Sequence, residues 1–137
     1  MATIKATATW MNNFRSIIDN SRDHTVTCDL PKPTGNDAGP TALELAIMSL
    51  AGCAATTFIE VCEQSKIKLT KLEVVAEAER QPDSPKLKSV TIKAKASAKA
   101  RKKLLEAAWR RTEANCPALF IFKEAIPLEA KFEPTTE

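Results

Sequence analysis

The stretch from Thr41 to Gln64 reads TALELAIMSLAGCAATTFIEVCEQ, and the rest of the chain has to fold around it. Between Ala42 and Cys62 nearly every residue is apolar or small, and the stretch contains no proline and a single glycine, Gly52. The apolar residues lie all round the helical wheel, which predicts a helix that is buried on most sides. Because one small sheet cannot cover such a helix, the pattern also indicates a second subunit.

A membrane span is the alternative interpretation of this stretch, since a span requires ~20 apolar residues. Two observations count against it. Glu44 and Glu60 lie near its ends, with Ser49, Thr56 and Thr57 between them, and the sequence contains no second stretch of this kind. We therefore favour a buried helix in a protein that does not associate with a membrane.

Composition narrows the class of protein. A chain of 137 residues is expected to form one domain, 1–137, with a core that needs no crosslinks. The net charge of +3 and the absence of Tyr give no reason to expect a nucleic-acid partner. The first residues, MATIKATATW, lack the apolar core of a signal peptide, so we expect a cytoplasmic protein. In that compartment four cysteines are more often free, catalytic or metal-binding than disulfide-bonded.

Alternation and turn signals predict the other elements. Strands are expected at Thr3–Trp10, Phe14–Asp19, His24–Leu30, Ile67–Ala78, Leu87–Ala96 and Ile126–Phe132, and helices at Ser97–Ala114 and Ala118–Phe122. The apolar stripe of the helix over Ser97–Ala114 is predicted to consist of Leu104, Leu105, Ala108 and Trp109. Thr41 and Glu44 have the spacing of a capping box at the start of the long helix. The order β-β-β-α-β-β-α-β, with antiparallel hairpins, corresponds to an α+β fold.

The spacing of the cysteines excludes two kinds of site. No C-x-x-C pair occurs and His24 is the only histidine, so a structural zinc site is not expected. Cys53 and Cys62 lie on opposite faces of one helix, roughly 13.5 Å apart along its axis. A disulfide needs Cα atoms within ~7 Å, so these two cannot pair. Cys62, like Cys28 on its strand, is therefore interpreted as a packing residue.

The roles of Cys53 and Cys116 stay open from spacing alone. Cys53 stands among alanines and Gly52, which leaves room for a small molecule, but a free cysteine also packs well in a core. Cys116 precedes Pro117 at the predicted start of a short helix, where N–H groups would stabilise a thiolate. If the fold brings the two thiols together, one could reduce a peroxide to give a sulfenic acid and the other could condense with it.

Three motifs carry a resemblance to a known family. The segment GPTALELAIMSLAGCAATT, the triplet Asn115-Cys116-Pro117 and the element order together resemble the OsmC/Ohr family of osmotic-stress and organic hydroperoxide resistance proteins. The resemblance covers nearly the whole chain. It implies an intertwined homodimer, with paired central helices wrapped by sheets of both chains and thiol sites at the interface. It also implies a thiol peroxidase for organic hydroperoxides that uses an external dithiol as reductant, with neither a metal nor a bound cofactor.

The family's functional residues can be matched onto this chain. The resemblance implies that Cys53 is the peroxidatic cysteine and Cys116 the resolving one. Arg15 is the best match for the arginine that holds the thiolate, and a guanidinium would lower the thiol's pKa. Glu44 is the candidate for the glutamate that orients this arginine, although the best-studied members carry that glutamate one position earlier, where this chain has Leu43. Glu44 could equally serve the partner's site, only cap its helix, or do neither.

An apolar acceptor pocket is also expected, which would favour alkyl peroxides over hydrogen peroxide. Its expected lining is Met48, Leu50, Phe120 and Phe122. Two rival functions stay open at this stage: a redox sensor that keeps the thiols but turns over slowly, and a dimer that holds a small hydrophobic ligand.

Overall fold

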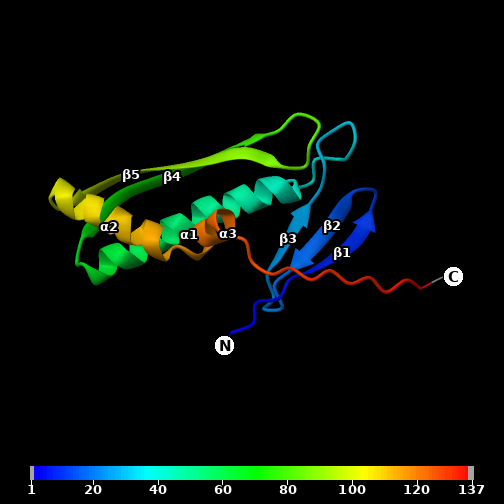
Figure 1. Ribbon diagram of the computed structural model, residues 1–137, viewed down its shortest axis with the longest axis horizontal. Coiled ribbons are helices and arrows are strands. Elements are labelled where there is room, and N and C mark those ends of the chain that lie inside the picture. Colours follow the sequence, from blue (N-terminus) through cyan, green and yellow to red (C-terminus); the bar gives the residue numbers. More distant parts are fainter. Residues whose placement is uncertain (1, 136–137) are drawn as a thin grey trace. The chain divides into compact units, whose positions relative to one another are not determined.

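The computed structural model describes residues 2–135, which form eight elements (Figure 1). The strands are β1 (Thr7–Asn12), β2 (Arg15–Asp19), β3 (Thr25–Cys28), β4 (Lys68–Arg80) and β5 (Leu87–Lys99). The helices are α1 (Ala42–Gln64), α2 (Lys102–Asn115) and α3 (Pro117–Lys123). The expected α+β class with antiparallel sheets is confirmed. By their contacts the residues divide into two units, one of residues 2–49 and 76–91 and one of residues 50–75 and 92–135. The expectation of one domain stays a prediction.

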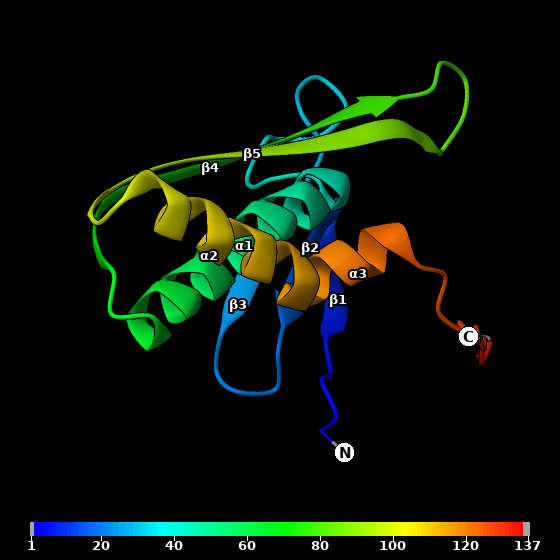
Figure 2. The same ribbon diagram turned by 60° about the vertical axis from the view of Figure 1, so that its left-hand side comes forward.

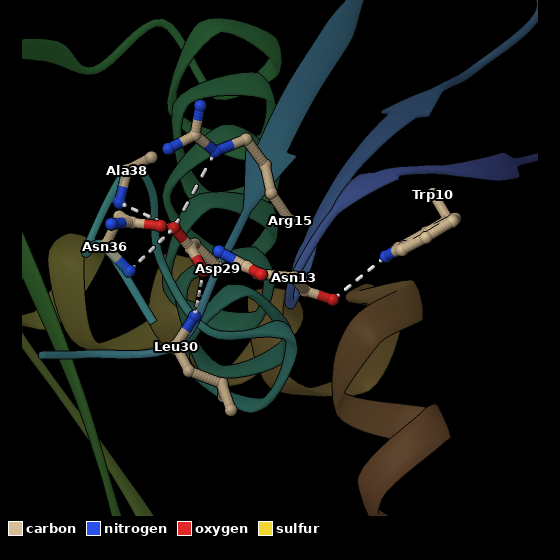
Figure 3. Close-up of polar contacts among 7 residues, drawn as sticks. All are labelled: Trp10, Asn13, Arg15, Asp29, Leu30, Asn36 and Ala38. Atoms are coloured by element: carbon tan, nitrogen blue, oxygen red, sulfur yellow. Dashed lines mark hydrogen bonds and ion pairs between the residues drawn. The ribbon is translucent and has the colours of Figure 1, made fainter. Parts of the chain in front are cut away.

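The first unit contains the antiparallel sheet β1-β2-β3. Its first strand begins at Thr7, later than expected, because Thr7 pairs with Asp19 and the residues before it have no partner on β2. The strand continues to Asn12, and the turn follows at Asn13, which has a φ of 44°. The Trp10 indole N–H donates to the Asn13 carbonyl over 2.9 Å and holds this turn (Figure 3).

A loop anchored by Asp29 follows β3, which ends at Cys28 instead of continuing to Leu30. Two glycines allow close approaches here. A Cβ on Gly35 would meet the Leu30 carbonyl, and a Cβ on Gly39 would meet the Thr27 carbonyl. The short β3 and the Gly-Pro-Thr sequence before α1 therefore fit together through backbone contacts that a side chain would block.

Helix α1 begins with the expected capping box. The Thr41 Oγ1 accepts from the Glu44 N–H over 3.0 Å, and the Glu44 carboxylate accepts from the Thr41 N–H over 2.9 Å. Together these bonds satisfy two N–H groups that the first turn of a helix leaves free.

In the single chain α1 is not buried on most sides, and the second subunit expected to complete its cover stays a prediction. Met48 is 56 % exposed and Ile59 43 % exposed. Within residues 2–135, α1 is also the one helix long and apolar enough to cross a membrane, and 28 % of its most apolar window is buried. A large apolar part of α1 is thus uncovered.

The core of the second unit lies between α1, α2 and the β4-β5 hairpin (Figure 2). Its buried cluster consists of Phe58, Val61, Cys62, Ile67 and Ala108. The Phe58 and Trp109 rings, one from each helix, pack with centroids 5.9 Å apart at a tilt of 58°. Aromatic pairs favour such tilted arrangements, so this contact helps to join α2 to α1.

Helix α2 starts later than predicted. The alternation of β5 continues to Lys99, where the Ser97 carbonyl accepts from the Thr70 hydroxyl on β4 over 2.9 Å, so the helix begins at Lys102. The predicted apolar stripe is wrong at one position. Leu104 is 43 % exposed, whereas Thr112, which was not in the stripe, is fully buried.

The predicted last strand at Ile126–Phe132 is also wrong. Residues 126–132 have no regular secondary structure, and Leu128 and Phe132 are each 86 % exposed. A strand is stabilised by its hydrogen bonds to a neighbour, and within residues 2–135 none pairs with this segment. The alternation of apolar and polar residues was therefore insufficient by itself to predict a strand here.

Candidate functional site

Cys53 and Cys116, which lie 63 positions apart in the sequence, meet in the second unit. Cys53 lies on α1 and is half-buried, and Cys116 lies between α2 and α3 and is fully buried. Their side chains form a hydrogen bond, and both thiols are free. The backbone that holds Cys116 is continuous with α2, because its N–H donates to the Thr112 carbonyl over 2.8 Å. The pairing on which a two-thiol reaction depends is therefore present within one chain.

The N-terminus of α3 contacts Cys53 rather than Cys116. The sequence led us to expect that Cys116, as N-cap, would be stabilised there, but its side chain makes no capping hydrogen bond. Pro117 has no N–H, and the next one, on Ala118, donates to the Cys53 sulfur instead. The N-terminal donor of this helix is thus directed at the half-buried thiol.

The environment of Cys53 nevertheless favours the protonated thiol. Burial raises the pKa of Cys53, and the hydrogen bond and charge interaction with Cys116 raise it further. The Ala118 N–H lowers it, but not enough to reverse the shift. Thr57 lowers the pKa least, and its hydroxyl hydrogen is donated to the Cys53 carbonyl over 2.9 Å. The net pKa lies above that of an ordinary cysteine, so the second unit by itself does not activate this sulfur.

A pocket of about 460 Å³ opens beside Cys53. It is lined by Cys53, Thr56, Thr57, Glu60, Val61, Gln64, Arg111, Asn115 and Pro117. The expectation of an apolar pocket is wrong here, because most of this lining is polar or charged. None of the four expected residues, Met48, Leu50, Phe120 and Phe122, belongs to it: Leu50 is buried in the core, and the other three are exposed.

The other two cysteines are packing residues, as their positions predicted. Cys62 belongs to the buried cluster of the second unit and is 1 % exposed. Burial raises the pKa of its thiol. Cys28 ends β3 and is 7 % exposed.

Arg15 lies in the first unit, on β2, and its partner there is a residue that the sequence analysis missed. Its Nε lies 3.8 Å from the Asp29 Oδ2 and is buried without a hydrogen-bond partner (Figure 3). Asp29 also accepts three backbone N–H bonds, from Leu30 at 2.8 Å and from Asn36 and Ala38 at 3.2 Å each. The signal in the sequence was weak: one acidic residue at the end of a strand, before a loop rich in proline.

The carboxylate of Asp29 is held in its charged form. Burial raises its pKa, but the hydrogen bonds from Leu30, Ala38 and Asn36, together with the Arg15 charge, outweigh this and leave the pKa below the ordinary value. Glu44, in contrast to Asp29, is exposed, and its carboxylate caps α1. Of the alternatives that the sequence left open for Glu44, the structure shows the capping role.

A comparison with protein families identifies the family of this chain. Residues 35–131 match the model of the OsmC-like proteins. The chain belongs to the OsmC-like family. The matched range includes Cys53 on α1 and Cys116 before α3. Arg15 and Asp29 precede it. The resemblance found from the sequence motifs is thereby confirmed.

Solved structures share this fold at low identity. An OsmC-like protein from Mycoplasma pneumoniae is 16 % identical, with a TM-score of 0.78 over 89 % of this chain and 88 % of that one. A hypothetical protein from Aquifex aeolicus is 18 % identical, with a TM-score of 0.76 over 90 % and 89 %. A Legionella pneumophila organic hydroperoxide resistance protein, OsmC, is 16 % identical, with a TM-score of 0.65 over 90 % of each chain. No curated protein matches the chain.

Proposed function

We propose that this chain is a thiol-dependent peroxidase that reduces organic hydroperoxides to alcohols. The observation that supports this most is the contact between Cys53 and Cys116 beside a pocket, with the Ala118 N–H directed at the Cys53 sulfur. Membership of the OsmC-like family, and the fold shared with a hydroperoxide resistance protein of L. pneumophila, point to the same redox chemistry.

The proposed reaction needs only the two thiols and an external dithiol. The Cys53 thiolate attacks the terminal peroxide oxygen, the O–O bond breaks, and the alkoxide takes a proton and leaves as an alcohol, with Cys53 oxidised to a sulfenic acid. The Cys116 thiol then attacks the Cys53 sulfur, a disulfide forms and water leaves. The dithiol reduces this disulfide and is itself oxidised to a disulfide. Neither a metal nor a bound cofactor takes part.

The thiolate needs a cation, because burial and Cys116 both favour the protonated form of Cys53. Arg15 remains our candidate for this role. We propose that its orienting carboxylate is Asp29 rather than Glu44, since Asp29 forms the ion pair with it and Glu44 caps α1. A guanidinium near the sulfur would lower the thiol's pKa.

We also propose that the functional form is a homodimer in the cytoplasm. The exposed apolar residues of α1 support a second copy as the cover for that helix. Glu60, which lies in the helix and lines the Cys53 pocket, would be costly inside a bilayer.

The decisive experiment is intact mass after mild treatment with cumene hydroperoxide, for wild type, Cys53→Ser and Cys116→Ser. We expect wild type to lose two hydrogens, Cys116→Ser to gain one oxygen at Cys53, and Cys53→Ser to remain unchanged. Turnover is then measured with a dithiol present. An unmodified Cys53 in wild type would refute the peroxidase.

A redox sensor is the second candidate, and one observation favours it. The raised pKa of Cys53 leaves little thiolate at neutral pH, which would make the thiol slow to react. In the experiment above, stoichiometric loss of thiols without continued peroxide consumption would indicate the sensor.

A further inference from the structure

The lining of the pocket beside Cys53 extends along α1. Four of its lining residues on α1, Cys53, Thr57, Glu60 and Gln64, are spaced by four, three and four positions, so they form one stripe along the helix. Cys53 and Gln64 are eleven residues apart, or about 16 Å along the helix axis. The reactive sulfur lies toward one end of this stripe, so a bound molecule could extend well away from the thiol.

Arg111 lies at the other end, and its guanidinium is held in place. Its Nη1 donates to the Ser65 Oγ over 3.0 Å and its Nη2 to the Gln64 Oε1 over 3.1 Å. The Asn115 side chain donates to the Arg111 carbonyl over 2.7 Å, which ties the last turn of α2 together. The cation therefore keeps a set position relative to the end of α1, which a mobile surface arginine would not.

The charge of Arg111 is not neutralised by these contacts. Both acceptors are neutral, and the ion pairs found within residues 2–135 involve Arg15, Lys102 and Lys131 instead. A guanidinium carries five N–H donors, so three remain for a further acceptor. Planar anions such as carboxylates fit this fork best.

Glu60 is the other charged residue of the pocket, and it lies between Cys53 and Gln64 on the same stripe. Its carboxylate repels an anion from the middle of the pocket. An anionic group of a ligand is thus attracted to the Arg111 end of the pocket and disfavoured closer to the thiol. The two charges therefore decide both the sign of the ligand's charged group and where it binds.

We infer that Arg111 is a specificity-determining residue that selects hydroperoxides carrying a carboxylate far along the chain from the –OOH group. This rests on the proposed peroxidase function and adds the residue that recognises the far end of the substrate. With the carboxylate at Arg111, the peroxide reaches Cys53, whereas a short acid cannot occupy both positions at once. Because both ends of the substrate are then held, we expect the loss of the Arg111 contact to change KM.

The test compares a long-chain hydroperoxy carboxylic acid with its methyl ester, which lacks the negative charge and adds one methyl group. We expect wild type to have the lower KM for the acid. Arg111→Gln should raise that KM about tenfold, the size of one charge-assisted hydrogen bond, and change the KM of the ester much less. Glu60→Gln should lower the KM of the acid, and added salt should weaken the preference.

The matched control is Arg110→Gln. Arg110 is the preceding residue on α2 and is also exposed, and it lines a different pocket, with Phe58 and Trp109. The two variants lose the same net charge, so a general electrostatic effect would appear in both. Equal KM values for the acid in the two variants would overturn the inference. Arg111→Lys keeps the charge without the fork and should recover part of the preference.

A second measurement does not depend on turnover. Dodecanoate should slow the alkylation of Cys53 by iodoacetamide more than dodecanol does, in wild type and Arg110→Gln but not in Arg111→Gln. If wild type reduces neither peroxide, the proposed function fails, and this protection alone decides whether Arg111 binds an anion. If peroxides are reduced but protection is the same with both ligands, only the role of Arg111 is refuted.

Discussion

At the scale of single residues, the structure adds one carboxylate that the sequence did not indicate and redirects one helix N-terminal donor. Asp29, buried at a strand end, holds Arg15, while Glu44 caps α1. The N-terminal donor of α3 serves Cys53, while Cys116, its N-cap, contacts Cys53 with its side chain. The contacts of Asp29 with Arg15 and of the Ala118 N–H with Cys53 each join different segments of the chain, so neither was predicted from the sequence.

The contact between the thiols leads to a prediction about pH. Cys116 raises the pKa of Cys53, and serine has no ionisable group in this range, so Cys116→Ser should lower that pKa. The rate of Cys53 alkylation, followed by peptide mass spectrometry from pH 6 to 11, should then rise at lower pH than in wild type. Cys62→Ala serves as the control, because Cys62 lies in the core and outside the Cys53 pocket. A profile that shifts equally in both variants would contradict the prediction.

Asp29 leads to a prediction about stability. Its pKa is lowered in the folded state, so the carboxylate stabilises the fold above its unfolded-state pKa, and this contribution is lost as the pH falls through the folded-state value. Asp29→Asn places an amide against three N–H donors and should be less stable at pH 7. The difference from wild type should narrow at acidic pH. Thermal unfolding across pH measures this, and Asp37→Asn, an exposed position in the same loop, should show no such trend.

At the scale of elements, hydrogen bonding at the ends decides where helices and strands start and stop. The alternation of β5 extends to Lys99 and delays α2. The segment over residues 126–132 alternates as well, but without a neighbouring strand it forms none. Local pattern therefore identifies an element only where a partner is present.

The capping box of α1 yields a prediction that separates two roles of Glu44. Thr41→Ala removes the side-chain acceptor for the Glu44 N–H and should cost about 1 kcal/mol of stability. Glu44→Gln keeps an acceptor for the Thr41 N–H and should be nearly neutral in both stability and peroxidase activity. Chemical denaturation and steady-state rates provide the two readouts. A large loss of activity in Glu44→Gln at unchanged stability would restore Glu44 to the site.

At the scale of the whole molecule, the feature that most needs an explanation is the set of exposed apolar residues on α1. A 23-residue helix carries Leu43, Met48 and Ile59 exposed, at 37 %, 56 % and 43 %. Monomeric proteins rarely leave large apolar patches in water, which is why we expect a second copy to cover this helix.

That expectation can be tested by mass measurement in solution. Ile59→Glu places a charge on the exposed apolar surface of α1 and should shift the protein from dimer to monomer in light scattering. Leu104→Glu is the matched control: it makes the same change at a residue that is also 43 % exposed, but on α2, and should stay dimeric. Wild-type protein that is monomeric at micromolar concentration would contradict the proposed homodimer.

The sequence by itself determined the elements whose signals are local: the long apolar helix with its cap, the hairpins, and the short helix after Cys116-Pro117. It also singled out Cys53 and Cys116 through a family resemblance. Only the tertiary structure decided which side chains meet. The pairing of Asp29 with Arg15, the Ala118 donor at Cys53, and Arg111 at the end of the pocket each join segments far apart in the chain. Periodicity and capping depend on neighbours within about four positions, whereas these contacts depend on packing across the fold.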